Sequence, residues 1–247
     1  MYSKLRSFLF ICLLGFQINC QTQQASVNIL DYDDKQIAET NISDEKIRLL
    51  FIESGLGEGD GKLEELMTFP KERIVAVVQK IKDNGVAEGE EGYQNEYQSE
   101  HLKIKSAYFL WKLGADTAAN EKYIVDLTKT KDFRRHYALS YLESIISEGK
   151  KEYLPVIFEF APEADAAYFT EVSGLFQYEL ENSPKTFLLY LSKMPFKIRK
   201  GVYEVVSFKG EVYDAETFQK IKANVGKLTE DKEVKNIAGE FLREVKN

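Results

Sequence analysis

A helical pattern that recurs about every 32 residues constrains the fold of this chain more than any other feature. Between residues 99 and 161, apolar residues follow each other at the three- and four-residue spacing typical of helices. This spacing predicts two helix pairs, 99–113 with 119–128 and 132–147 with 150–160. One such pair is too small to bury its apolar face alone, so the pattern predicts an array of stacked units.

The same period continues further along the chain. The first helices of successive units are expected to begin near residues 99, 132, 164 and 196. Helices are also expected on either side, with Ser43, Asp214 and Thr229 as N-terminal caps, since short polar side chains suit that position. No segment shows the clean two-residue alternation of a strand, and 202–208 is interpreted as helical because it is in phase with the units. The chain is therefore predicted to be all-α, with about four to five antiparallel helix pairs.

The second predicted helix pair, 132–147 with 150–160, resembles a HEAT-like repeat. An aspartate lies near the start of its first helix, an arginine pair and an Ala-Leu step follow, and a proline opens its second helix. The residues that carry this resemblance are Asp132, Arg134, Arg135, Ala138, Leu139, Leu154 and Pro155. The resemblance covers 99–208 as a period and a pattern, and the second helix pair matches the repeat pattern best. It implies a HEAT-like α-solenoid and assigns no functional role to individual residues.

The N-terminus has the features of an export signal. Lys4 and Arg6 precede an uncharged apolar run, 7–16, which is too short to span a bilayer. Cys20 follows this run and is itself followed by polar residues. The arrangement resembles the lipobox of bacterial lipoproteins, and it implies cleavage after 1–19 and lipidation of Cys20.

The lipobox departs from the usual pattern at two positions. Gln17 stands where the family usually has Leu, and Asn19 stands where it usually has a small residue. Two alternatives are an ordinary cleaved signal, which would release a soluble periplasmic or secreted protein, and an uncleaved signal anchor. The predicted organisation after the signal is a flexible polar tether, 20–42, and a helical-repeat domain, 43–247, with a flexible acidic insertion at 84–98.

Composition limits the chemistry that the chain can perform. The two cysteines, Cys12 and Cys20, lie at the N-terminus, and the two histidines are His101 and His136. The predicted helical domain therefore lacks the side chains for a thiolate or histidine-rich metal site. Because 40 Asp and Glu outnumber 33 Lys and Arg, nucleic-acid binding is not expected. We predict no metal and no cofactor. The acidic loop with Glu58, Asp60 and Glu64 offers oxygen donors for calcium, but its spacing does not fit an EF-hand.

The aromatic residues provide the candidate binding face. The sequence contains 14 Tyr and 16 Phe, and tyrosine suits half-buried interface positions because its ring packs while its hydroxyl stays hydrated. The candidate residues are Tyr108, Trp111, Arg134, Arg135, Tyr137 and Tyr141. Core filling explains the aromatics equally well, and ion pairs with acids of a neighbouring unit explain the arginines. His101 is expected to be exposed at a polar helix start.

The function expected from these observations is non-catalytic. We predict an extracytoplasmic scaffold in the bacterial cell envelope that is lipid-anchored and binds a protein or peptide on its helical surface. One alternative is a periplasmic inhibitor or immunity-type protein for a basic enzyme, which the acidic charge would suit. Another is a hydrolase acting on cell-envelope material with paired carboxylates such as Glu143 and Glu148. The oligomeric state stays open.

Overall fold

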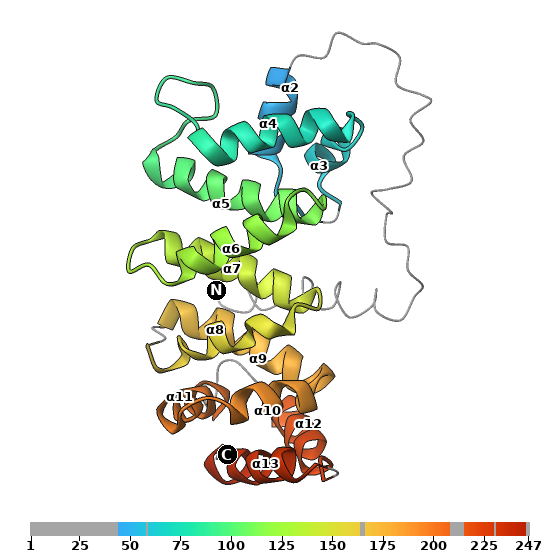
Figure 1. Cartoon of the computed structure of the whole chain (residues 1–247), viewed down its shortest axis with the longest axis vertical. Helices are drawn as coiled ribbons and strands as arrows, with labels where there is room; N and C mark the ends of the chain where they lie inside the picture. Colours follow the sequence, from blue (N-terminus) through green and yellow to red (C-terminus); the bar gives the residue numbers. More distant parts are fainter. Residues whose placement is uncertain (1–43, 58, 164–165, 208–214, 230, 246–247) are drawn as a thin grey trace. The chain divides into compact units, whose positions relative to one another are not determined.

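The computed structural model describes residues 44–57, 59–163, 166–207, 215–229 and 231–245, apart from the side chains at 166–171 and 215. The signal, Cys20 and the tether lie outside these residues. All regular structure in the described part of the chain is helical (Figure 1), which confirms the all-α prediction. The chain divides into two compact units, 1–77 and 78–247, and each is described by itself.

The first unit contains two short helices and the start of a third. They are α2 (Asp44–Glu53), α3 (Gly61–Leu66) and the first turns of α4 (Lys71–Asn84). Ile47, Phe51 and Leu66 are buried in this unit. Asp60 begins α3 by accepting hydrogen bonds from the Lys62 and Leu63 amides at 2.8 and 3.2 Å, which satisfies donors that the first turn leaves open.

The second unit begins in α4 and continues to the last described helix. Its elements are α5 (Glu96–Lys112), α6 (Thr117–Thr128), α7 (Arg134–Ser147), η1 (Lys151–Tyr153), α8 (Leu154–Phe158), η2 (Ala161–Glu163), α9 (Ala166–Asn182), α10 (Pro184–Ser192), α11 (Phe196–Ser207), α12 (Ala215–Gly226) and α13 (Lys232–Glu244). First helices of successive pairs contact one another, α5 with α7, α7 with α9 and α9 with α11. α13 contacts both α10 and α12.

Several element boundaries differ from the sequence-based expectation. The first helices begin at 96, 134, 166 and 196 rather than near 99, 132, 164 and 196. α5 starts earlier because the Asn95 carboxamide accepts a hydrogen bond from the Gln98 amide at 2.9 Å and caps the helix there. As a result, the non-helical part of the expected acidic insertion is limited to 85–95.

Two other expectations about helix ends are corrected. The helix expected over 150–160 is split into η1 and α8, and Pro155 occupies the first turn of α8, where its missing N–H costs nothing. The cap of the last helix is Asp231 and not Thr229, since the Asp231 carboxylate accepts from the Glu233 and Val234 amides at 2.8 and 3.3 Å.

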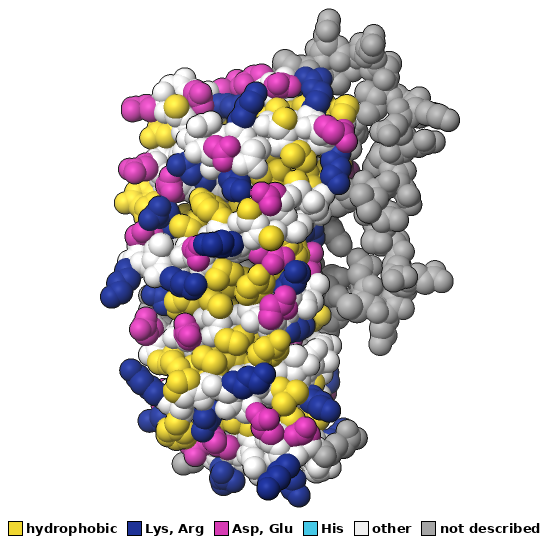
Figure 2. Space-filling view, viewed as in Figure 1, with side chains coloured by type: hydrophobic (Ala, Val, Ile, Leu, Met, Phe, Trp, Pro, Cys, Tyr) yellow, Lys and Arg dark blue, Asp and Glu magenta, His cyan; other side chains and the backbone are white. Residues whose placement is uncertain are grey.

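The core of the second unit consists mainly of aliphatic and phenylalanine side chains. Phe158, Phe176 and Phe187 from α8, α9 and α10 meet edge to face, with ring centroids 4.9–5.6 Å apart. α11 buries Val202, Val205 and Val206, which confirms the helical interpretation of this segment. On the face seen in Figure 2, other apolar side chains reach the surface between charged ones. In the part of the chain that the structure describes, no helix is both long and apolar enough to cross a membrane.

Candidate functional site

Seven aromatic side chains lie along the contact between α5 and α7. We call this set the aromatic seam. Its members are Tyr97, His101, Tyr108 and Trp111 from α5 and Phe133, Tyr137 and Tyr141 from the start and body of α7. The three- and four-residue steps place many of these residues on one side of each helix, and the packing of α5 against α7 brings the two rows together.

Five rings of the seam form a continuous stack. Tyr137 lies on His101 with centroids 4.2 Å apart and an interplanar angle of 19°. The stack continues from His101 to Tyr141 at 5.9 Å, from Tyr141 to Tyr108 at 5.0 Å and from Tyr108 to Trp111 at 5.9 Å. Offset, nearly parallel rings at these separations attract one another beyond the effect of their buried area. The stack therefore joins the first helices of two successive helix pairs, α5 and α7.

The seam lies at the margin of the core and not inside it. Tyr108 is buried, whereas His101, Trp111, Tyr137 and Tyr141 are half-buried. The neighbouring face of α7 carries the core residues proper, among them the fully buried Leu142. The rings cover part of each other's faces, and the hydroxyl groups of Tyr141 and Tyr108 bond to His101 and Glu148.

His101 is held inside the stack, so the expectation that it is simply exposed is wrong. Its Nε2 lies 3.0 Å from the Tyr141 hydroxyl, and its ring is stacked against Tyr137. Burial, and then the positive charge of Lys105, lower the pKa of His101 below its usual value. Neutral imidazole is the form that this position favours.

At its open end the seam finishes with a pair of rings in a different geometry. Tyr97 meets Phe133 edge to face, with centroids 4.5 Å apart and planes at 63°. Tyr97 is 59% exposed, and Phe133 is half-buried. An exposed tyrosine held against a second ring offers apolar surface at a fixed position.

At its other end the seam is fixed by two glutamates. The Tyr108 hydroxyl donates to Glu148 at 3.0 Å, and Lys112 donates to the same carboxylate oxygen at 2.8 Å. Glu148 follows the last residue of α7, so this contact fastens the end of α7 to α5. Of Glu143 and Glu148, the pair considered for hydrolysis, Glu143 lies in α7 and Glu148 directly after its end, where Tyr108 and Lys112 bind it.

The second glutamate, Glu121 of α6, joins three elements. Its carboxylate accepts from Trp111 Nε1 at 2.7 Å and from the Tyr153 hydroxyl at 2.7 Å, and it pairs with Lys150 at 2.9 Å. Burial acts to raise the pKa of Glu121, but the bonds from Lys150, Tyr153 and Trp111 outweigh it and leave the pKa below its usual range. Glu121 is therefore a charged residue that binds Trp111, Tyr153 and Lys150. We call this set of contacts the Glu121 clamp.

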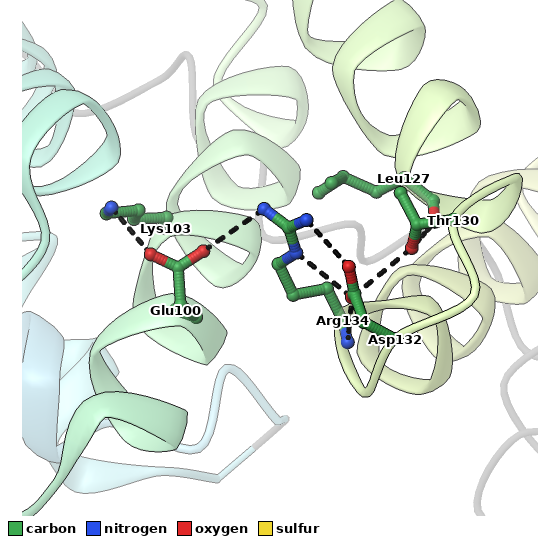
Figure 3. A network of polar contacts seen from close by, with 6 residues as sticks. All are labelled: Glu100, Lys103, Leu127, Thr130, Asp132 and Arg134. Carbon is green, nitrogen blue, oxygen red and sulfur yellow. Dashed lines mark hydrogen bonds and ion pairs between the residues drawn. The ribbon is translucent and has the colours of Figure 1, made fainter.

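Arg134 belongs to a surface network beside the seam (Figure 3). Its Nε and Nη2 donate to the two Asp132 oxygens at 3.0 and 2.7 Å, and its Nη1 lies 3.8 Å from Glu100 on α5. Glu100 is also bound by Lys103 at 2.6 Å. The Arg134 guanidinium lowers the pKa of the Asp132 carboxyl to about 2. This arginine links the start of α7 to α5.

Arg135 contacts the segment that follows α8. Its guanidinium lies over the Phe160 ring at 4.0 Å, and its Nη2 donates to Glu163 at 3.3 Å. Arg134 thus links α7 to α5, and Arg135 links α7 to the segment after α8.

The structure brings four predicted residues, Tyr108, Trp111, Tyr137 and Tyr141, into one stack. Sequence reasoning missed Tyr97, His101 and Phe133 as members of the seam. The signal that could have found them is the four-residue step that links Tyr97 to His101 and Phe133 to Tyr137. Cys20, the predicted lipidation site, lies outside the described residues.

The acidic loop considered for calcium has another role at its described end. The Asp60 carboxylate is engaged by backbone amides, including that of Gly55, and Glu58 lies outside the described residues. Within the described segments, no three His, Cys, Asp or Glu side chains gather closely enough to hold a metal ion.

Comparison with known proteins does not identify a family for this chain. No family model matches the chain, and neither a curated protein nor a solved structure matches it.

Proposed function

We propose that this protein is a non-catalytic scaffold of the cell envelope that binds a protein or peptide at the aromatic seam. The observation that carries the proposal is the row of half-buried and exposed rings along α5 and α7. Rings that served only as core would be buried like Phe158, Phe176 and Phe187.

The chemistry of the seam supports protein binding. Tyrosine and tryptophan dominate the energetics of protein interfaces because they offer a large rigid area at a small entropic cost. The stack and the two glutamates fix the rings before any partner arrives, and such preorganisation reduces the cost of binding.

We further infer that residues 78–247 form a HEAT-like solenoid. The contacts of α5 with α7, α7 with α9 and α9 with α11 support this arrangement, because each helix pair then touches the next pair in sequence. Solenoids use their extended faces for binding, so this architecture is consistent with the proposed role.

Crosslinking followed by pull-down from native membranes tests the binding proposal. The variant Tyr137→Ala removes a half-buried ring of the seam, and Tyr190→Ala removes a half-buried tyrosine of α10 as a matched control. We expect Tyr137→Ala to recover at least about tenfold less partner, as for a truncated interface anchor, and Tyr190→Ala to recover the normal amount. Equal recovery with both variants would count against the seam as the binding surface.

The membrane attachment is proposed through Cys20. The basic start, the short apolar run and the position of this cysteine support lipidation. Fractionation and intact-mass measurement of wild type and Cys20→Ala test it. We expect the variant to leave the membrane fraction and to lack the mass of the acyl groups. A variant that stayed membrane-bound with no change in lipid mass would disprove the anchor.

A further inference from the structure

A glutamate of α9 is buried with half of its carboxylate unsatisfied. Glu179 is 0% exposed, and its Oε1 accepts a hydrogen bond from the Lys151 ammonium of η1. Its Oε2 has no hydrogen-bond partner among the described residues. A buried carboxylate that is not fully bonded carries its charge at a cost that a neutral carboxylic acid does not have. The surroundings of Glu179 therefore favour the protonated form more than water does.

Two opposing effects set the proton affinity of this carboxylate. Burial raises the pKa of Glu179, whereas the hydrogen bond and the positive charge of Lys151 lower it, and burial is the larger effect. The half-buried charged side chains on the helices packed against α9 are Arg134, Arg135 and Glu143 of α7, Arg199 of α11 and Lys222 of α12. Neither these nor the exposed Lys185 of α10 and Lys220 of α12 change the pKa of Glu179. In the described part of the chain, Lys151 is the charge that acts on it.

The chain around η1 connects this pair to the tryptophan end of the aromatic seam. Lys150 and Tyr153 bind the carboxylate of the Glu121 clamp at 2.9 and 2.7 Å. Lys151, which lies between them in the sequence, binds Glu179 instead. A 3-10 helix of three residues has few backbone bonds of its own, so these side-chain contacts help to fix the position of η1. The Glu121 carboxylate also accepts the indole N–H at that end of the seam, at 2.7 Å, so a displacement of η1 reaches the seam.

We propose that the Glu179–Lys151 pair is a proton-sensitive contact that controls the tryptophan end of the aromatic seam. With Glu179 ionised, Lys151 holds η1 against α9, and the Glu121 clamp stays complete. When Glu179 takes up a proton from solvent, Lys151 keeps its own charge but loses the attraction. Its side chain is 20% exposed, so its ammonium can turn to water and release η1. The bonds that Glu121 receives are then weakened, and no partner is needed for this response.

Nuclear magnetic resonance of the indole N–H tests this inference on the full chain. The sequence contains one tryptophan, so the ¹H–¹⁵N spectrum has one indole signal, and this N–H donates to Glu121. Glutamine has the shape of the protonated acid and carries no charge. At about pH 7.5, above the usual carboxyl range, we expect Glu179→Gln to move the indole signal and to speed its hydrogen exchange by at least about tenfold. An indole signal identical to that of wild type would overturn the inference.

Two further variants separate this pair from a general effect of charge. Lys151→Met removes the cation and should move the indole signal in the same direction as Glu179→Gln. Glu240→Gln is the matched control, because the Glu240 carboxylate of α13 is likewise bound by a cation and a phenol, Arg199 and Tyr203. The indole signal of this control should match that of wild type. An equal displacement in Glu240→Gln would overturn the inference.

A pH titration of the same signal tests the role of the proton. All samples carry His101→Gln, which removes the histidine of the seam. We expect the indole signal to move between about pH 7 and about 4, and the movement to be at least about half smaller when Glu179→Gln is added.

Urea denaturation of the same two samples measures the burial of the charge independently. The raised pKa means that the native state binds this proton more tightly than the unfolded state does. The protein with Glu179 should therefore gain stability relative to Glu179→Gln as the pH decreases through the carboxyl range. If stability follows this direction while both samples give the same indole titration, the carboxylate is buried as described and its link to the seam is wrong.

Discussion

At the residue scale, Gly201 marks a close approach between α11 and η2. A Cβ atom at this position of α11 would lie 2.7 Å from the backbone nitrogen of Pro162 and 2.9 Å from its Cα. These are backbone and ring atoms, which cannot move aside as the end of a long side chain can. The contact of α11 with η2 therefore requires glycine here.

We expect Gly201→Ala to lower the free energy of unfolding by about 1–3 kcal/mol, as for other overpacked sites. Gly174→Ala is the matched control, because a Cβ added at this position of α9 would have nothing within 4 Å. This control should stabilise the protein by about 0.5–1 kcal/mol through the better helix propensity of alanine. Urea denaturation followed by circular dichroism measures both. Equal stability of the two variants would contradict the close approach.

The lowered pKa of His101 predicts a dependence of stability on pH. The native state disfavours the charged imidazole, so the unfolded state binds more protons below the ordinary histidine pKa of 6.5. The contribution of His101 is complete above that pH and is lost as the pH decreases below it. We expect wild type to lose stability relative to His101→Gln between about pH 7.5 and about 5. Denaturation across this range measures the difference.

His136 provides the control for that experiment. It is the second histidine of the chain and is exposed near the start of α7. His136→Gln controls for the loss of a histidine that lies outside the stack. If both histidine variants behaved alike, the stack would not be the origin of the effect.

At the element scale, the Glu121 clamp joins α6 to the end of α5 and to η1. Its side chain is 9% exposed and receives Trp111, Tyr153 and Lys150. Removing it leaves the indole N–H and the phenol O–H without their acceptor, and the cost of such orphaned donors is large.

We expect Glu121→Ala to destabilise the protein by about 2–4 kcal/mol. Asp126→Ala, on the exposed side of the same helix, removes only surface ion pairs with Lys122 and Lys129 and should change stability little. Thermal unfolding of the two variants compares them. Similar losses in both would show that the clamp carries no special weight.

The helices themselves can be predicted from the sequence because their signals are local. The apolar spacing, Pro155 and Pro184 near helix starts, and glycine after helices together define most elements to within a few residues. The cap of α13 cannot be chosen in this way, since Thr229 and Asp231 both have capping side chains two residues apart. In the structure, the Asp231 carboxylate accepts from the Glu233 and Val234 amides, which makes Asp231 the cap.

The candidate site is predictable only in part, for a physical reason. Tyr137 and Tyr141 can be placed on one side of a helix from their spacing alone. Whether they are core or surface depends on how α7 lies on α5, and no local signal in either helix contains that information. The prediction for His101 is wrong for the same reason, because the residues just before it in the sequence are polar and its neighbours in space are rings.

At the scale of the whole molecule, the last helix closes the second unit. α13 packs on α10 and α12, and its inward side chains include Val234, Ile237 and Phe241. Glu240 of the same helix takes both Nε and Nη2 of Arg199, at 2.8 and 3.1 Å, and a hydrogen bond from Tyr203 at 2.9 Å. Its outward side is polar, with Lys232, Glu233, Lys235 and Asn236 exposed.

We expect Phe241→Ala to cost about 3–5 kcal/mol, because a fully buried ring that meets Tyr203 edge to face would be replaced by a cavity. Arg243→Ala, on the exposed side of α13, should leave stability nearly unchanged. Thermal denaturation and limited proteolysis measure the effect. Retained protection of α10 and α12 in the Phe241 variant would mean that α13 does not close this unit.

Trp111 gives the seam a built-in optical probe. It is the one tryptophan in the sequence, it ends the ring stack, and its indole N–H is bonded to a carboxylate. Excitation at the red edge of protein absorbance therefore reports from a single known position, without any label. A ligand that loosens or tightens the stack should change the wavelength and the intensity of the Trp111 emission. The intact protein can therefore be screened for partners by its intrinsic fluorescence.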